Sequence, residues 1–174
     1  MKIAINCRLW LPGQLEGVGF FLQEVVNRWL ANRPDDVFHL LFDRRPTIDF
    51  SEQANVRVHV MFPPARHPIL YRLWLNGRLP RRLRRIRPDV FFSPEPLCPL
   101  PYAGAQIITV HDLAYLHYPN TFAPGNLAYY KKYMPQFIQE ADEIITVSSF
   151  TQKDIFKHFP EAAHKVSVAR NGCR

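Results

Sequence analysis

The chain has 174 residues, of which 47% are hydrophobic, and it carries a formal net charge of +7. This length is enough for one domain with a real core, and no apolar run approaches the length of a membrane span. The start lacks a signal-peptide pattern, and Cys7, Cys98 and Cys173 are too widely spaced for a disulfide framework or a zinc site. We therefore expect a globular, reduced, metal-free protein of the cytoplasm.

Strand and helix patterns alternate along the whole chain. Short β-branched or apolar runs predict strands at 3–5, 37–42, 56–60, 89–93, 105–110, 143–147 and 165–169. Apolar residues at helical spacing predict helices at 18–31, 69–86, 125–141 and 149–158, the second of them kinked at Pro80 and the last capped by Ser149. This alternation predicts a Rossmann-like, doubly wound α/β fold with a mainly parallel sheet and helices on both faces.

The first strand-to-helix connection carries two glycines, Gly17 and Gly19, at the start of the predicted helix. Glycines there let a ligand approach backbone N–H groups, and the helix dipole favours an anion such as a phosphate. Leu22 stands where a dinucleotide fingerprint needs its third glycine, and the connection is longer than that motif allows. The loop therefore suits a larger anionic ligand, unless the glycines only ease the entry of the chain into the helix.

The positive charge is concentrated in residues 53–88, which contain nine arginines and no acidic residue. Leu79, Leu83 and Ile86 share one face of the predicted helix, and Trp74 belongs to an apolar stripe one turn earlier. The opposite face of this part of the helix, together with the residue just before Leu79, is basic: Arg78, Arg81, Arg82, Arg84 and Arg85. Such a helix suits an anionic membrane surface, or it packs on the sheet with a solvated outer face. Nucleic acid is disfavoured because the rest of the chain is close to neutral and shows no binding module.

His111 and Asp112 appear abruptly after the β-branched run at 105–110. That run predicts a strand buried on both faces of a parallel sheet. Ligands bind at the carboxyl ends of strands in open α/β sheets, so the pair predicts a site. The alternative is a structural His-Asp pair that closes a loop.

The other histidines carry less information. His39 and His59 lie within predicted strands, which favours core or edge positions over ligand binding. His111 and His117 are six residues apart, which is not a helical metal-ligand spacing. We therefore expect no metal site.

Several short motifs follow one another along the chain: GVGF (17–20), VHDL (110–113) with YPNTF (118–122), ADEIITVSSFT (141–151) and KVSVARNG (165–172). In this order they resemble the amino-terminal half of a family 4 (group 1) glycosyltransferase of the GT-B fold. The resemblance implies that residues 1–172 form the acceptor-side, Rossmann-like domain. It also implies that residues 173–174 begin the interdomain linker, and that the carboxy-terminal donor-binding domain is absent from the chain.

The resemblance also implies roles for individual residues. His111 would be catalytic, near the transferred sugar, and Gly17 and Gly19 would bind the donor diphosphate. Contacts to the acceptor would come from Arg8, Asp112 and Tyr115. The basic residues that hold the diphosphate belong to the absent domain, so we expect the fragment alone to be inactive.

The expected reaction is a retaining, metal-independent hexosyl transfer from a nucleotide-sugar, with no other cofactor, to a glycan or lipid-linked acceptor. Bacterial polysaccharide biosynthesis is the usual setting of the family, with the enzyme in the cytoplasm or at the inner face of the membrane. Two other functions stay open: a non-catalytic Rossmann-like binding module, or a split-enzyme subunit whose partner supplies the missing half. A nicotinamide-binding dehydrogenase is disfavoured by the long first loop.

Overall fold

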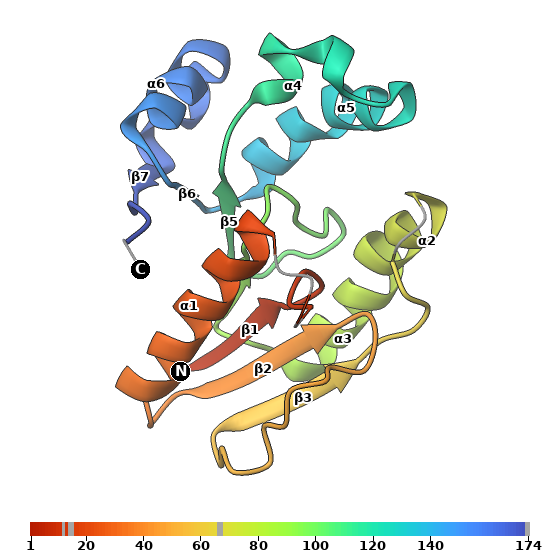
Figure 1. Cartoon of the computed structure of the whole chain (residues 1–174), viewed down its shortest axis with the longest axis vertical. Coiled ribbons are helices and arrows are strands. Elements are labelled where there is room, and N and C mark those ends of the chain that lie inside the picture. Colours follow the sequence, from red (N-terminus) through yellow and green to blue (C-terminus); the bar gives the residue numbers. More distant parts are fainter. Residues whose placement is uncertain (12, 14–15, 66–67, 173–174) are drawn as a thin grey trace. The chain divides into compact units, whose positions relative to one another are not determined.

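The computed structural model describes residues 1–11, 13, 16–65 and 68–172 (Figure 1). The chain divides into two compact units. The first consists of Met1–Pro94 and Pro101–Ala105, and the second of Glu95–Leu100 and Gln106–Arg174. Each unit is built on parallel strands with helices between them, which confirms the predicted α/β class. Among the described residues, none of the helices is both long and apolar enough to cross a membrane.

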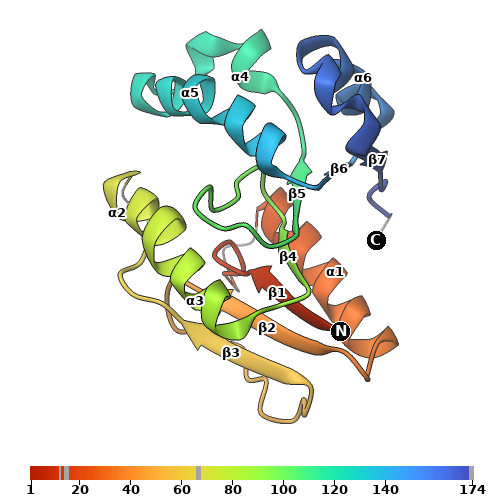
Figure 2. The same cartoon turned by 180° about the vertical axis from the view of Figure 1, so that it is seen from behind.

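The first unit holds a parallel sheet in the order β3-β2-β1-β4. Its strands are β1 (Lys2–Asn6), β2 (Val37–Phe42), β3 (Val56–Val60) and β4 (Val90–Ser93). Its helices are α1 (Gly17–Asn32), α2 (Pro68–Leu73), the π-helical turn η1 (Trp74–Arg78) and α3 (Leu79–Ile86). Within this unit α1 lies on one face of the sheet, and α2 and α3 lie on the other (Figures 1 and 2).

Apolar residues spaced along one side of α1 hold it on the sheet. Leu22 and Val26 are fully buried, and the edge of the Trp29 ring packs on Phe92 with the ring centroids 5.1 Å apart. The helix ends where the N–H of Arg33 donates to the carbonyl of Trp29, just before a proline. The predicted helix at 18–31 is thus confirmed to within a residue at each end.

Instead of a kink at Pro80 itself, the helix has the π-helical turn η1, which ends at Arg78, two residues before that proline. Proline has no N–H to donate, and its ring clashes with the carbonyl four residues earlier, so the helix widens at this point. Trp74 and Leu75, at the start of the turn, are fully buried, whereas Leu73 is 58% exposed. Trp74 therefore packs in the core, in line with the alternative of a helix packed on the sheet, and its ring is not available to a membrane surface.

The second unit holds parallel strands in the order β5-β6-β7. These strands are β5 (Gln106–Val110), β6 (Glu143–Thr146) and β7 (Val166–Val168). Its helices are α4 (Ala114–His117), α5 (Pro124–Glu140) and α6 (Ser149–His158), with 3-10 turns at η2 (Pro119–Thr121) and η3 (Pro160–Lys165). Ile108, Thr109 and Val110 are fully buried, as expected for a strand covered on both faces.

The cap of α6 lies one residue earlier than predicted. The side-chain oxygen of Ser148, not that of Ser149, accepts from the backbone N–H of Thr151 at 3.1 Å. A capping oxygen bonds the N–H two or three residues ahead, so the first helical residue decides which of two adjacent serines caps. Ser149 is that first residue and already belongs to the helix.

Arg87 ends α3 in a left-handed conformation, with φ of 51°, while its N–H donates to the carbonyl of Leu83 at 2.8 Å. A residue with a Cβ atom is strained by roughly 1–2 kcal/mol in this conformation. Glycine avoids the strain but loses more backbone entropy on folding, so only part of this energy is gained. We expect Arg87→Gly to raise the free energy of unfolding in urea by about 0.5–1 kcal/mol. Arg85→Gly, inside the same helix, is the matched control and should lower it by about 1 kcal/mol. Equal losses in both variants would contradict the prediction.

Candidate active site

In the second unit, the carboxyl end of β5 leads into the 111–117 segment, which comprises His111, Asp112, Leu113 and α4. His111 is half-buried and follows the last residue of the strand directly. Its backbone carbonyl accepts a hydrogen bond from the hydroxyl of Thr151, in the first turn of α6, at 2.9 Å. The predicted position at a strand end is therefore confirmed, while the role of the imidazole stays a prediction.

Asp112 is exposed, and its side chain stabilises the turn that follows it. One of its carboxylate oxygens accepts from the backbone N–H of Ala114 at 2.9 Å, in a turn that starts α4. This bond fixes the direction in which the chain leaves His111. A contact between Asp112 and an acceptor stays a prediction, since the other oxygen of the exposed carboxylate can still be reached.

Tyr115 lies in the core of the second unit, with 4% of its surface exposed. Its ring stacks on that of Tyr130, with centroids 5.8 Å apart. Burial, and then the negative charge of Asp154, raise the pKa of Tyr115 to about 12, so its hydroxyl stays protonated at neutral pH. Packing alone accounts for this side chain, and its acceptor contact stays a prediction.

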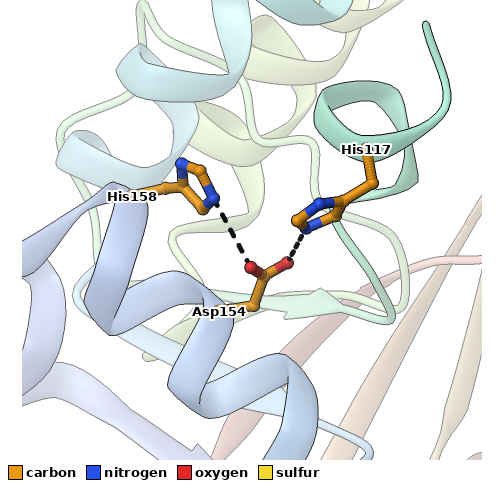
Figure 3. Close-up of side chains that lie close together, drawn as sticks. All are labelled: His117, Asp154 and His158. Atoms are coloured by element: carbon orange, nitrogen blue, oxygen red, sulfur yellow. Dashed lines mark hydrogen bonds and ion pairs between the residues drawn. The ribbon is translucent and has the colours of Figure 1, made fainter.

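Asp154 of α6 lies between two imidazoles (Figure 3). One carboxylate oxygen is 2.7 Å from Nε2 of His117, at the end of α4, and the other is 3.5 Å from Nε2 of His158. The prediction of no metal-ligand set compared His117 only with His111 and missed this cluster. A sequence signal existed, because Asp154 and His158 are four residues apart on a predicted helix and so share a face.

In the first unit, Arg8 follows β1 and is half-buried. Its N–H donates to the side chain of Asn6 at 3.2 Å, and its guanidinium lies 4.7 Å from the ring centroid of Tyr71 in α2. The amide of Asn6 in turn donates to the hydroxyl of Ser93, at the end of β4. Stacking on an aromatic face is a common way to hold a guanidinium in place. The contact of Arg8 with the acceptor stays a prediction.

The two predicted glycines begin α1. Gly17 is exposed, and a Cβ atom built on it would meet nothing within 4 Å, whereas Gly19 is buried. The N-cap residue is Glu16, whose side chain makes no capping hydrogen bond, and no acidic residue follows it in the first turn. The first N–H groups of a helix lack intrahelical partners, so this end can receive an anion. Packing does not require glycine at position 17, and its role in binding an anion stays a prediction.

Four of the arginines predicted for a membrane surface are exposed: Arg78, Arg81, Arg84 and Arg85. Arg84 also donates to the carbonyl of Pro101, and Arg82 is half-buried. The charge of Arg82 contributes, after burial and His39, to lowering the pKa of His59 to about 4. His59 and His39 hydrogen-bond through their rings at 2.8 Å, between the paired strands β2 and β3. Their mutual hydrogen bond gives these two histidines a structural role in the sheet.

The predicted site residues fall in both units. Arg8, Gly17 and Gly19 belong to the first, and His111, Asp112 and Tyr115 belong to the second.

Several solved structures resemble the whole chain. Three of them are a glycosyltransferase from Rickettsia africae ESF-5 (11% identity, TM-score 0.57), the lipopolysaccharide outer core galactosyltransferase WaaB (14%, 0.59) and Anabaena HepE in complex with UDP and glucose (17%, 0.58). The alignments cover 99% of this chain but only 43%, 46% and 45% of those chains, so it spans less than half their length. At these identities the likeness shows the fold alone, which is the Rossmann-like α/β fold of GT-B glycosyltransferases.

Among curated proteins, none matches the sequence significantly. The sequence model of the family described as Glycosyltransferase Family 4, however, matches residues 16–174, which is nearly the whole chain. This match agrees with the parallel α/β units and with the fold of the similar structures. The chain belongs to Glycosyltransferase Family 4.

Proposed function

We propose that this chain is the acceptor-side domain of a retaining glycosyltransferase. The whole enzyme would move a hexose from a nucleotide-sugar to a glycan or lipid-linked acceptor, in bacterial polysaccharide biosynthesis. The observation that carries the proposal is the family match over residues 16–174. The presence of UDP and glucose in the Anabaena HepE structure supports a nucleotide-sugar as the co-substrate.

The start of α1 would supply hydrogen-bond donors for the diphosphate of that donor. Transfer passes through an oxocarbenium-like state in which the departing diphosphate gains negative charge. The free N–H groups and the positive end of the helix dipole stabilise such charge, and the carboxylate of Glu16 at the N-cap makes no capping bond that would occupy them. Gly17 leaves open space for the phosphate to approach. These donors are backbone groups, so this part of the binding needs no metal ion.

His111 would position the transferred sugar. Its backbone is held on one side by the hydroxyl of Thr151 and on the other by the turn that Asp112 makes with Ala114. A ring carried on such a fixed backbone loses little entropy when it hydrogen-bonds a sugar hydroxyl. In this segment we assign Asp112 and the hydroxyl of Tyr115 to the acceptor, while the ring of Tyr115 packs in the core. In the first unit we assign Arg8 to the acceptor.

The similar structures are more than twice as long as this chain. We assign the cationic partners of the diphosphate to a donor-binding domain outside residues 1–174. Without those cations the helix end alone cannot offset the charge of the leaving group. Residues 1–174 by themselves are then catalytically silent.

The activity is tested by incubating the enzyme that carries this chain with a panel of UDP-, GDP- and ADP-sugars and glycan acceptors. We expect release of a nucleoside diphosphate with one donor, with an α-linked donor giving an α-linked product in the proton NMR spectrum. Added Mg²⁺ or Mn²⁺ should leave the rate unchanged. Inversion of the linkage, or transfer by residues 1–174 alone, would contradict the proposal. Donor binding without turnover across the panel would favour a non-catalytic module.

His111→Ala tests the positioning role in the same enzyme. We expect kcat to fall by roughly 100-fold, because misplacing the sugar by about an ångström costs that much. The thermal unfolding midpoint should stay the same, since only a half-buried ring is removed. His164→Ala, at an exposed position in η3, is the matched control and should retain full turnover. Unchanged turnover in His111→Ala would remove this residue from the site.

We also propose that the exposed arginines around α3 bind anionic lipid at the inner face of the membrane. Arg78, Arg81 and Arg85 are exposed, and residues 53–88 around them contain no acidic residue. Trp74 is buried and contributes nothing at the surface, so the attraction would be electrostatic. Each arginine near an anionic surface adds about 1 kcal/mol, and salt screens the effect.

Vesicles of phosphatidylglycerol and phosphatidylcholine test this attachment by co-sedimentation. The double variant Arg81→Gln, Arg85→Gln should lower the partition coefficient by roughly 30-fold at low salt, as two such contributions are lost. Lys153→Gln with Lys157→Gln removes the same charge from exposed positions of α6 and serves as the control. Equal losses in the two double variants would show that only net charge matters, and would argue against a surface at α3.

A further inference from the structure

We propose that His117, Asp154 and His158 form a binding site for a divalent transition-metal ion such as Zn²⁺. All three residues belong to the second unit. One ligand atom from each lies within 4.8 Å of the others, and both imidazole Nε2 atoms face the carboxylate (Figure 3). The binding proposal is independent of the proposed sugar transfer.

Two of the ligands come from one helix and the third from another element. Asp154 and His158 are one helical turn apart on α6, the spacing by which a helix presents two ligands on one face. The capped first turn, from Ser148 to Thr151, orders this helix before any ligand arrives. His117 is the last residue of α4, and its ring meets that of His158 edge-on with centroids 5.7 Å apart. The two imidazoles therefore approach the carboxylate from different directions, as the ligands of one ion must.

The distances fit an ion after a small adjustment. A tetrahedral Zn²⁺ at about 2.0–2.2 Å from each ligand atom separates those atoms by roughly 3.3–3.5 Å. Nε2 of His158 lies 3.5 Å from one oxygen of Asp154, which is already this length, and Nε2 of His117 lies 2.7 Å from the other oxygen. The His117 contact must lengthen by about 0.7 Å, and the ion takes either both oxygens or one of them after a rotation of the carboxyl group. The imidazoles are 36% and 31% exposed, so their rings have room to make this movement.

The chemistry of the ligand set selects the class of metal. Two imidazole nitrogens and one carboxylate oxygen are typical of Zn²⁺, Co²⁺ and Ni²⁺ sites, whereas Ca²⁺ and Mg²⁺ prefer oxygen ligands throughout. Three protein ligands leave at least one position for water. The carboxylate of Asp154 is only 8% exposed, so a dication compensates a charge that water solvates poorly.

A bound ion would tie both ends of the 111–117 segment to α6. The first turn of this helix already holds the carbonyl of His111 through Thr151. Through Asp154 and His158, the ion would hold His117 at the other end. Metal binding then orders the segment that carries His111, and this consequence alone depends on the proposed function.

The test is a titration of the untagged full chain, freed of metal with EDTA, with ZnCl₂ by isothermal titration calorimetry. We expect one equivalent to bind, and a 100-fold excess over Kd to raise the thermal unfolding midpoint by roughly 5–10 °C. His117→Gln and His158→Gln should each weaken binding at least tenfold. His164→Gln, at an exposed position of η3, is the matched control and should bind like the parent chain.

The absorption spectrum of bound Co²⁺ gives a second test, which does not depend on the stability of the fold. The parent chain should show the visible absorption bands of four-coordinate Co²⁺, and these bands should disappear in His117→Gln and His158→Gln. Absence of Zn²⁺ binding by the parent chain would overturn the proposal. So would binding that survives both substitutions, or that falls equally in His164→Gln. None of these readings measures sugar transfer, so their failure would leave the proposed transferase activity standing.

Discussion

A parallel strand buried on both faces can carry polar functional groups only where it ends, because its earlier side chains have no access to water. β5 follows this constraint: Ile108 and Val110 are fully buried, and His111 is the first residue beyond the strand. In the first unit, β1 ends in Asn6, which hydrogen-bonds to Ser93 at the end of β4. The candidate residues of each unit therefore gather where hydrophobic burial stops.

In the second unit, α6 fixes the segment that follows the end of β5. Ser148, Thr151, Asp154 and His158 follow one another at intervals of three or four residues, so they form a single stripe along the helix. This stripe caps the helix, holds the carbonyl of His111 and pairs with the ring of His117. Each neutral hydrogen bond contributes about 1 kcal/mol, and those to a charged carboxylate contribute more. The 111–117 segment thus takes its conformation largely from one helix.

Much of the architecture was predictable because local patterns report which side of an element is buried. The β-branched run before His111 and the helical spacing of α1 both led to the observed elements to within a residue or two. The predictions of local structure failed where the sequence allows two local conformations equally well. Ser148 and Ser149 are both suitable caps, and a helix approaching Pro80 can kink at that residue or widen before it. Helical spacing placed Trp74 on a stripe but carried no information on whether the stripe meets the sheet or water.

The sequence by itself determined the fold class, the family resemblance, the glycines at the start of α1 and the polar pair that ends β5. These depend on residue type and short spacing, which a linear chain displays directly. Only the tertiary structure decided that His117 meets Asp154, 37 residues further along the chain. It also buried Tyr115 against Tyr130 and left Gly17 open. Such contacts depend on strand order and on how helices pack on a sheet, and no local periodicity contains that information.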